Sequence, residues 1–461
     1  MPTHDDNHTQ SLTEQLIFET YRKPVSDDDL HRSAQHVLDF LGCAAAAMNS
    51  DAANSYRQLL NDSISGPVSA VFCGRYELQA GLSFNAAIGN VLEMDDIHRS
   101  STLHPGPVII PAALAVAQWQ KASMSDFLVA IIKGYELTIR LGQSIGRSHY
   151  QYFHNTSTCA SLGAAYSAAL LLKLSPAQCV AAVGNAGSRT GGVWQMRHES
   201  VMTKQWHNSE AAKSGVNAAV MARYGVTGPA FILEGEQGLF QAMSHDADTT
   251  MFMRSYAHWL IHEVSFKPWP ACRHAHPAID VCQQVLRQLK HQGQSVNALD
   301  IEAIDIDTYQ DAITFCDRRI IECETHAKFS IQHAIAALIL CGEPALAHYQ
   351  QAIYDDPRII ALREKVRVGL SVNIESDYPN HYGARCQIRL LDGTSCQAYS
   401  KDTLGDPERP LTSHQLTNKA LMLLAHGKVD VQTARRLASL DWYQHRDLTA
   451  LTGLLEPSDE S

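Results

Sequence analysis

The sequence predicts a mainly α-helical protein with a large all-helical domain and a smaller α+β domain. Three observations support this prediction. Runs of Ala, Leu and Val at helical spacing dominate the first 264 residues, strand-like alternation is confined to the region that follows, and helical spacing returns near residue 405. We therefore expect an all-helical domain over residues 10–264, an α+β domain over residues 265–404, and C-terminal helices over residues 405–455 that return to the helical domain.

The N-terminal half contains a series of expected helices. Ser26 is a good N-cap for the first clear helix, and the aspartates at positions 27–29 suit the positive end of its dipole. Because the later segments are apolar on all sides, we expect them to be buried in a large bundle. These further helices are expected over residues 109–120, 127–142, 159–174, 176–187 and 210–225.

The region after residue 265 mixes strands with helices. Residues 301–309 and 365–374 alternate between apolar and polar side chains, as strands do. Residues 384–400 show the same alternation around Asp392-Gly393, which is a strong signal for a hairpin turn. Helices are expected over residues 276–290 and 328–342.

The composition excludes several classes of protein. A net charge of −11 without a run of basic residues argues against binding to nucleic acid or to an anionic membrane. No uncharged run reaches the roughly 20 residues that a membrane-spanning helix needs, and the acidic, polar N-terminus does not resemble a secretory signal. The 11 cysteines are scattered without a CxxC pair, which indicates free thiols in a reducing cytoplasm and no zinc or iron–sulfur site.

Four polar stretches interrupt the apolar pattern, and each leads into the first turn of an apolar helix. They span residues 93–106, 146–161, 191–215 and 266–280 and contain several His, Lys and Arg side chains. A helix N-terminus offers N–H groups and a positive dipole end, so four of them together would suit a polyanionic small molecule. A single histidine more often has a structural role, whereas Lys204 is harder to explain in that way, because a lysine is rarely buried without a partner.

Several short motifs occur in an order typical of one known family. They are MDDIHRSSTLHPG (94–106), HNTSTCASLGAAYSAALLL (154–172), MTKQWHNSEAAKSGVNAAVMARYGVTGP (202–229), KPWPACRHAHPAID (267–280) and ETHAKFSIQHAIAALILCG (324–342). Over nearly its whole length the chain resembles the MmgE/PrpD family, which includes 2-methylcitrate dehydratase, cis-aconitate decarboxylase and iminodisuccinate epimerase. The resemblance implies a large helical domain plus a smaller α+β domain, usually in a homodimer, and no required metal or other cofactor.

The resemblance also identifies candidate site residues. Removal of water, carbon dioxide or a proton beside a carboxylate needs cations that hold carboxylates, a base, and an acid on the opposite face. By resemblance, the active-site positions are Asp95, His104, His154, Lys204, His207 and Lys267, and Tyr150 matches a tyrosine of the epimerase-like branch. We add Arg273 and His276, from the same motif as Lys267, as candidate substrate-binding residues.

Each candidate has an expected role. We expect Lys204 to act as a carboxylate clamp or as the base. His154 and Tyr150 would transfer protons on the opposite face of the substrate. His104 and the Asp95-Asp96 pair would orient water or a substrate hydroxyl, while Lys267 with Arg273 would hold a distal carboxylate.

Two positions depart from the decarboxylase-like members of the family. Those members carry an aspartate and a histidine where this chain has Glu93 and Cys272, which weakens an assignment as cis-aconitate decarboxylase. Cys272 lies beside Arg273 and is a candidate nucleophile. A packed thiol is the simpler interpretation, because none of these reactions requires a covalent intermediate.

Two further hypotheses concern cofactors. Asp95, Asp96, His98 and His104 are ligand types that suit a divalent metal, although a hydrogen-bonded polar wall is the preferred interpretation. The glycine-rich segments 187–192 and 235–238 lack the strand–turn–helix context of a nucleotide-binding loop, so we expect ordinary loops there.

The sequence therefore predicts a cytoplasmic lyase that acts on a small di- or tricarboxylate by general acid–base chemistry. Dehydration of a 2-hydroxy acid of the 2-methylcitrate type, catalysed by a hydro-lyase, is the preferred reaction. An isomerase or epimerase of a substituted succinate is the second hypothesis, decarboxylation of the cis-aconitate type stays open, and a non-enzymatic scaffold comes last. The enzymatic reactions all need the same acid–base groups, so the sequence alone does not choose among them.

Overall fold

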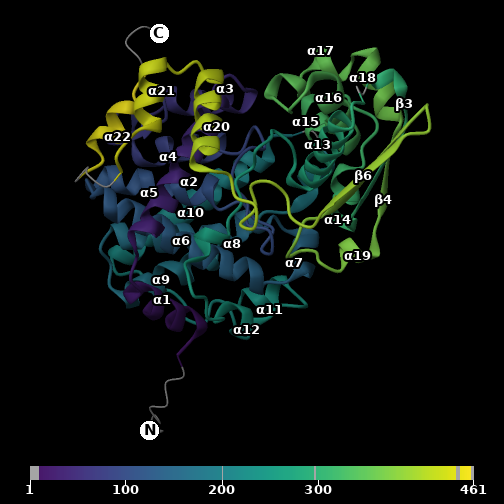
Figure 1. Cartoon of the computed structure of the whole chain (residues 1–461). Coiled ribbons are helices and arrows are strands. Elements are labelled where there is room, and N and C mark those ends of the chain that lie inside the picture. Colours follow the sequence, from purple (N-terminus) through teal and green to yellow (C-terminus); the bar gives the residue numbers. More distant parts are fainter. Residues whose placement is uncertain (1–9, 200, 295–296, 443–446, 458–461) are drawn as a thin grey trace. The chain divides into compact units, whose positions relative to one another are not determined.

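The computed structural model describes residues 10–199, 201–294, 297–442 and 447–457. Most of the described chain is helical, and its strands form two small sheets (Figure 1). This architecture confirms the predicted mainly α fold class with a smaller α+β part. Residues 443–446, which fall within the predicted C-terminal helical segment, lie outside the described residues. No helix among the described residues is long and apolar enough to cross a bilayer.

The chain divides into two compact units, which we call unit 1 and unit 2. Unit 1 contains the chain up to Val91, Asp95–Val264 and the chain from His414 onward, and unit 2 contains Leu92–Met94 and Ser265–Ser413. Two features correct the predicted boundaries. The segment just after residue 404 stays with unit 2 up to Ser413, and a three-residue piece of the expected helical domain also belongs to unit 2.

Ion pairs within unit 2 explain both corrections. Arg409 pairs with Asp280 of the long helix that begins unit 2, so the chain leaves this unit later than expected. Glu93 pairs with Lys267 at 3.3 Å, which attaches the short 92–94 segment to unit 2. Hydrophobic periodicity carries no information about such pairs, because they depend on tertiary contacts between distant residues.

Unit 1 is built around the buried helix α8, which packs against α6, α9 and α10. Its described helices are α1 (Leu12–Arg22), α2 (Asp27–Ala46), α3 (Asp51–Asn61), α4 (Leu78–Ile88), α5 (Gly106–Gln120), α6 (Met124–Ser144), α7 (Arg147–Tyr152), α8 (Asn155–Leu171), α9 (Pro176–Gly187), α10 (Thr203–Arg223), α11 (Leu239–Met243), α12 (Thr249–Phe252), α20 (Ser413–His426), α21 (Val431–Ala438) and α22 (Thr449–Leu454).

Local sequence explains where these helices begin and how closely they pack. Ser26 caps α2 as predicted, and Asp29 closes a capping box by accepting from the Ser26 backbone N–H at 2.8 Å. The contact between α6 and α8 requires glycine, because a Cβ at Gly163 would lie 1.9 Å from the Thr138 hydroxyl oxygen. Small residues therefore bring the α8 backbone close to its neighbours, as the alanine-rich sequence predicts.

The C-terminal helices, drawn in yellow in Figure 1, pack with the N-terminal helices of unit 1. Lys419 of α20 pairs with Asp39 of α2 at 2.6 Å, and both side chains are buried. Burial raises the pKa of Asp39 to about 6, although the Lys419 charge opposes that shift. Unit 1 also contains a small hairpin of β1 (Val68–Ala70) and β2 (Gly74–Tyr76). The prediction that this part of the chain is all-helical was therefore wrong at the hairpin.

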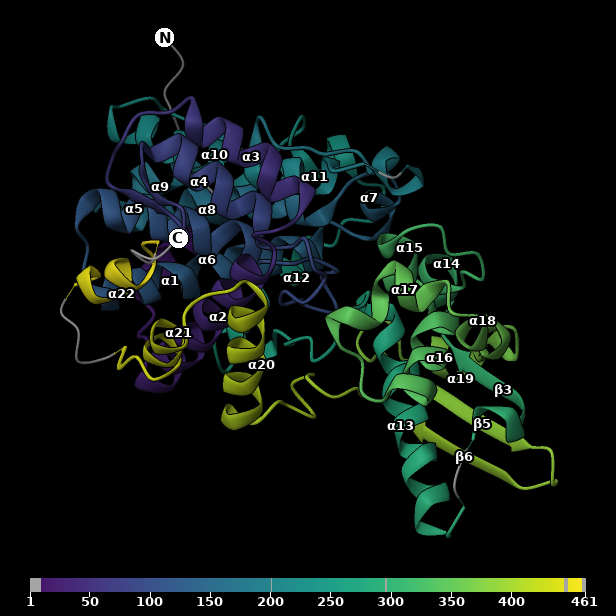
Figure 2. The same cartoon turned by 90° about the horizontal axis from the view of Figure 1, so that it is seen from above.

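Unit 2 contains a four-stranded sheet in the order β4-β3-β5-β6, with α13 packed against β5 and β6 (Figure 2). Strand β3 runs parallel to β4 and antiparallel to β5. The Asp392-Gly393 hairpin joins β5 to β6, as predicted. The elements are β3 (Ile301–Thr308), β4 (Val366–Leu370), β5 (Ala384–Leu390), β6 (Ser395–Ser400), α13 (His276–His291), α14 (Gln310–Cys316), α15 (Glu324–Lys328), α16 (Ile331–Cys341), α17 (Gln351–Tyr354), α18 (Pro357–Glu364) and α19 (Val372–Glu375).

Candidate active site

A loop between α4 and α5 carries the two neighbouring aspartates and is fastened to the start of α8. The Asn155 side-chain amide donates to the Ser101 carbonyl oxygen at 3.0 Å. The backbone N–H of His104 donates to the Thr156 hydroxyl oxygen at 3.0 Å. These bonds connect the loop to a buried helix, so residues 95–104 form a fixed wall of unit 1 and not a mobile surface loop.

His104 and Asp95 form an ion-pair contact, which we call the Asp95–His104 dyad. The Nδ1 atom of His104 lies 2.8 Å from Asp95 Oδ2 and 2.9 Å from the backbone oxygen of Asp96. Because both neighbours are acceptors, Nδ1 carries the proton, and Nε2 is the nitrogen that can exchange a proton with a ligand. Asn90 fixes the dyad by donating to Asp95 Oδ1 at 2.6 Å. The His104 side chain is 14% exposed, so a small ligand can reach it.

Asp96 has a different environment from Asp95, although the two are adjacent. Its carboxylate accepts from the His36 ring and from the Tyr135 hydroxyl, each at 2.7 Å, and from the Gly106 backbone N–H at 2.9 Å. The side chain is buried, and α5 begins at Gly106. Asp96 therefore holds the start of α5, and the two adjacent carboxylates of the predicted pair have different partners: Asp95 lies beside His104 and Asn90, and Asp96 binds His36, Tyr135 and Gly106.

His154 and His207 form a second pair of side chains in the same unit. Their Nδ1 atoms are 3.3 Å apart, and the His154 ring also packs against Trp194 with centroids 4.7 Å apart. Burial lowers the pKa of His154 well below its ordinary value, and the nearby positive charge of Lys204 adds to this effect. Burial also lowers the pKa of His207. Both rings are therefore neutral near pH 7, which is the protonation state that a general base must have.

Lys204 and Tyr150 complete this cluster. Lys204 lies in the first turn of α10, as predicted, but its side chain is partly exposed where the sequence suggested burial. Tyr150 lies edge-on to Trp194 with ring centroids 5.6 Å apart, and Trp194 in turn contacts His154. The structure thus places all six predicted catalytic residues in unit 1, as neighbours through direct contacts or through electrostatic interaction: Asp95, His104, Tyr150, His154, Lys204 and His207.

Buried neutral histidines give a prediction for pH dependence. The pKa of His36 and of His149 is about 4 in the folded protein, mainly because of burial, against 6.5 ordinarily. The unfolded chain therefore binds more protons between pH 6.5 and 4, so stability is complete above pH 6.5 and falls on acidification. Each ring should cost about 2 kcal/mol at pH 5. The raised pKa of Asp39 opposes this trend but does not cancel two histidines.

We expect the melting temperature of the protein to be several degrees lower at pH 5 than at pH 7. His149→Gln should make this difference smaller, because the His149 ring is hydrogen-bonded to two neutral groups, the Met243 carbonyl oxygen and the Thr158 hydroxyl. An equal or higher melting temperature at pH 5 would show that buried histidines do not control acid stability.

Lys267 of unit 2 is fully buried and pairs with Glu93. The Glu93 backbone has φ of +56°, in the left-handed region that costs a non-glycine residue roughly 1 kcal/mol. The chain adopts this conformation while Glu93 contacts the lysine at 3.3 Å. Glu93 therefore compensates the charge of Lys267, a role that its sequence position did not reveal.

Cys272 is a buried thiol close to this ion pair. It forms a hydrogen bond with Cys316, and its backbone N–H donates to the Lys328 carbonyl oxygen at 2.9 Å. Burial by itself would raise the pKa of Cys272, but the bond with Cys316 and the charge of Lys267 bring it below the ordinary value. Its partner moves the opposite way, because burial and Cys272 raise the pKa of Cys316. Cys272 is 6% exposed, which favours the predicted packed thiol over a nucleophile.

The terminal guanidinium nitrogens of Arg273 and both ring nitrogens of His276 are engaged inside unit 2. Arg273 pairs with Asp406 and donates to the ring of His276, whose Nδ1 lies 3.1 Å from the guanidinium. The other ring nitrogen of His276 lies 3.1 Å from the Ala271 carbonyl oxygen. Both side chains are buried. This geometry favours a structural role for the two residues over the predicted contact with substrate.

The predicted alternatives can also be placed. The His98 ring is hydrogen-bonded to the Ser101 hydroxyl at 2.7 Å, and the Asp96 carboxylate accepts from three donors. The four proposed metal ligands, Asp95, Asp96, His98 and His104, therefore do not converge on one point. Both glycine-rich segments, 187–192 and 235–238, are mostly loops after helices, as predicted. The first lines a pocket of about 820 Å³ in unit 1, which includes His207 but none of the other predicted catalytic residues.

Sequence reasoning missed several residues that position the site. His36 and Tyr135 hold Asp96, and they come from helices that carry no polar stretch. Asn90 precedes the first polar stretch, while Trp194 lies inside the third. His36 lies in α2 among other polar side chains, such as Arg32, Gln35 and Asp39, so no sequence signal distinguished it as a partner of Asp96.

Comparisons with known proteins agree with this architecture. The MmgE/PrpD N-terminal domain matches residues 15–251, and the MmgE/PrpD C-terminal domain matches residues 269–444. The chain therefore belongs to the MmgE/PrpD family.

Several curated relatives are similar along the chain. Cis-aconitate decarboxylase of Homo sapiens is 25% identical, with 94% of this chain and 91% of that protein covered. 2-Methylcitrate dehydratase of Escherichia coli (strain K12) is 26% identical, with 74% of each chain covered. Mitochondrial 2-methylcitrate dehydratase of Yarrowia lipolytica (strain CLIB 122 / E 150) is 26% identical over 61% of this chain and 57% of that protein.

Proposed function

We propose that the protein is a lyase that acts on a small di- or tricarboxylate, and that it dehydrates a 2-hydroxy acid of the 2-methylcitrate type. The single observation that carries this proposal is the combination, within unit 1, of the Asp95–His104 dyad with the neutral ring of His154. A dehydratase needs one group that takes a proton and another that gives one. Similarity to 2-methylcitrate dehydratases supports the choice of substrate class.

The environments of the two histidines suggest how the roles divide. His154 is kept neutral, so it is the proposed base that takes a proton from the carbon beside a carboxylate. His104 is the proposed acid, because its Nδ1 is held between Asp95 and the Asp96 carbonyl oxygen, which leaves its Nε2 to donate to the departing hydroxyl. One C–H bond and one C–O bond break, a carbon–carbon double bond forms, and water leaves.

Lys204 is proposed to stabilise the intermediate charge. Removal of a proton beside a carboxylate drives negative charge into that carboxylate, where a nearby ammonium group is favourable. Tyr150 and His207 are proposed to orient the substrate and the His154 ring. A contact between Lys267 and a distal carboxylate stays a prediction, because this side chain is fully buried and paired with Glu93. Arg273 and His276 support the segment that carries Lys267.

Two other reactions remain candidates. Decarboxylation is supported by the similarity to cis-aconitate decarboxylase over nearly the whole chain, although Glu93 and Cys272 depart from the decarboxylase pattern. Epimerisation of a substituted succinate would use the same base and acid. Incubation in deuterated buffer with citrates, aconitates and substituted succinates separates these reactions.

The readouts are ultraviolet absorbance and proton NMR. A dehydratase should create or consume a conjugated double bond and exchange one carbon-bound hydrogen for deuterium. A decarboxylase should release carbon dioxide in addition, and an epimerase should exchange the hydrogen without a new chromophore. If none of these acids gave either hydrogen exchange or a change in absorbance, the proposed lyase activity would be contradicted.

We further propose a homodimer located in the cytoplasm. Large apolar side chains are exposed around α10 and the loop after it, at Trp206, Met221, Tyr224, Val226 and Phe231, and a second copy of the chain would cover them. All eleven cysteines are free in the structure, which suits a reducing compartment. Light scattering that gives the mass of a single chain at micromolar concentration would contradict the dimer.

We expect catalysis to be independent of metal ions. The proposed reaction uses protein acids and bases and one lysine, so turnover should survive dialysis against a chelator. Recovery of lost activity by a divalent metal would instead favour the Asp95, Asp96, His98 and His104 metal hypothesis.

A further inference from the structure

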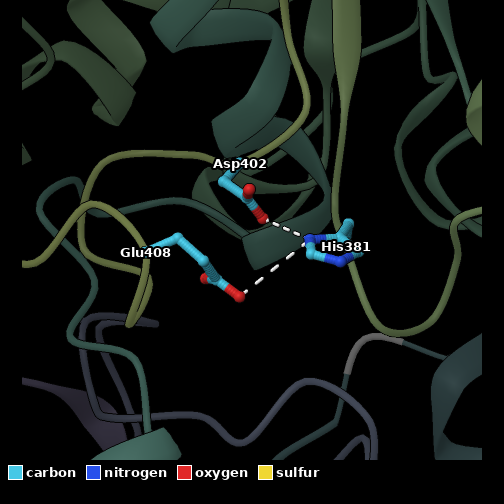
Figure 3. A group of neighbouring side chains, drawn as sticks. All are labelled: His381, Asp402 and Glu408. Atoms are coloured by element: carbon cyan, nitrogen blue, oxygen red, sulfur yellow. Dashed lines mark hydrogen bonds and ion pairs between the residues drawn. The ribbon is translucent and has the colours of Figure 1, made fainter.

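Three side chains of types that can ligate a metal lie together at the surface of unit 2, far along the chain from the candidate catalytic residues. His381, Asp402 and Glu408 each contribute a ligand atom, and these atoms lie within 4.8 Å of one another (Figure 3). The Nδ1 atom of His381 is 2.7 Å from Asp402 Oδ1 and 4.0 Å from Glu408 Oε1. The three residues come from separate places: the loop before β5, the segment just after β6, and the segment that leaves unit 2.

The backbone around two of these ligands is fixed by other contacts. The Arg409 guanidinium donates to the Asp402 carbonyl oxygen at 2.8 Å and to the Ser400 hydroxyl at 3.1 Å. Arg409 is itself paired with Asp280 of α13. Ligands held in place by such surrounding contacts lose less freedom when a metal binds, so the cluster is preorganised on the Asp402 side.

The histidine is also held on its own segment. Its backbone N–H donates to the Asp377 carbonyl oxygen at 3.0 Å, and the following Tyr382 is fully buried. The side chain of Asp377 pairs with Lys401 at 3.0 Å. Lys401 and Arg409 are the cationic residues next in sequence to the two acidic ligands. Lys401 pairs with Asp377, and Arg409 pairs with Asp280.

The electrostatics of the cluster favour a cation. Two carboxylates face one imidazole nitrogen, and a single proton on that nitrogen makes a good hydrogen bond to Asp402 only, since 4.0 Å to Glu408 is too long. A divalent ion between the three atoms would contact all of them at about 2.0 to 2.2 Å after a small closure of the Glu408 side chain. One nitrogen and two oxygen ligands suit zinc or manganese better than calcium or magnesium.

We propose that His381, Asp402 and Glu408 bind one divalent transition-metal ion that fastens the exit segment of unit 2 to the loop before β5. The role of this ion is structural. The site uses none of the residues assigned to catalysis, so loss of the metal should lower thermal stability and leave turnover in place. The proposal does not depend on the lyase activity.

Isothermal titration of Zn²⁺ into the full-length, chelator-dialysed protein tests this proposal. We expect each chain to bind one Zn²⁺ ion tightly. The affinity for Zn²⁺ should be at least about tenfold weaker in each of the three variants His381→Gln, Asp402→Asn and Glu408→Gln. The melting temperature of the unsubstituted protein should rise with added Zn²⁺ and should rise less in the variants. Mg²⁺ and Ca²⁺ should give much smaller shifts, because the site contains an imidazole.

A matched control lies in the same unit. His326 and Glu322 form another partly exposed pair, with Nδ1 and Oε2 3.6 Å apart, and the two belong to no three-ligand group in the described chain. The double variant His326→Gln/Glu322→Gln should bind Zn²⁺ like the unsubstituted protein. Unchanged zinc affinity in the Glu408→Gln and His381→Gln proteins, or no binding up to about 1 mM zinc, would overturn the proposal.

Discussion

Replacing Lys204 with methionine is expected to lower turnover by a factor of roughly 10² or more, while the melting temperature stays the same or rises. The substitution keeps the length and the apolar stem of the side chain and removes only its charge. Lys204 lies in the first turn of α10, where a positive charge opposes the helix dipole, so folding gains nothing from it there.

The reason for the loss of turnover lies in the neighbouring histidine. The Lys204 charge helps to lower the pKa of His154, and we propose that it also stabilises the anionic intermediate. The variant should therefore lose intermediate stabilisation and also shift the acidic limb of the pH–rate profile towards higher pH. A lysine that merely pairs with a structural carboxylate would change neither quantity.

Lys213→Met is the matched control. It lies on the same helix, is also partly buried, and pairs with Glu210 at 2.9 Å. Its removal should cost at most about 0.5 kcal/mol of stability and leave turnover close to that of the unsubstituted protein. Near-normal turnover in the Lys204→Met protein, combined with a lower melting temperature, would remove Lys204 from the catalytic residues.

The fold was largely predictable, because its signals are local. Helical spacing and N-caps identify the main helices of unit 1, and α9 begins and ends at the predicted residues, 176 and 187. The small hairpin of β1 and β2 was missed, since strands of three residues are too short to show alternation. The expected strand over 365–374 ends at Leu370, where the backbone turns into the short helix α19.

The candidate site was predictable only in part. Motifs identify which stretches are polar, and the structure places Asp95, His104 and His154 near one another. The partners of a given side chain depend on contacts between distant segments. Arg273 pairs with Asp406 after a separation of more than a hundred residues, so the sequence could not show that this arginine is already engaged.

The sharpest example is the adjacent pair Asp95 and Asp96, which the sequence treats as equivalent. Replacing each with asparagine should give opposite results. Asp95→Asn should reduce turnover by roughly 10² or more with little change in stability. Asp96→Asn should lower the free energy of unfolding by about 3 to 5 kcal/mol, the usual effect of breaking a buried charged network.

The loss of activity in Asp95→Asn follows from the protonation of His104. Asn90 donates to one oxygen of Asp95, so the new amide oxygen would face Asn90 and the new NH₂ group would face His104 Nδ1. That contact favours the tautomer with the proton on Nε2. It also opposes the hydrogen bond from Nδ1 to the Asp96 backbone oxygen.

The loss of stability in Asp96→Asn follows from the number of donors. His36, Tyr135 and Gly106 all donate to the Asp96 carboxylate, which has two acceptor oxygens. An asparagine has one acceptor oxygen and a donor NH₂, so at least one buried donor would face another donor. The start of α5 at Gly106 would lose its anchor.

Turnover and urea unfolding measured on the same preparations separate the two effects, with each value compared to the unsubstituted protein. If both variants lost stability and neither lost turnover beyond its unfolded fraction, the dyad of Asp95 and His104 would be structural. If Asp96→Asn were the variant that stayed folded and lost turnover, the carboxylate that takes part in catalysis would be Asp96 and not Asp95. Only a loss of activity confined to Asp95, with a loss of stability confined to Asp96, agrees with the hydrogen bonds that the two carboxylates accept.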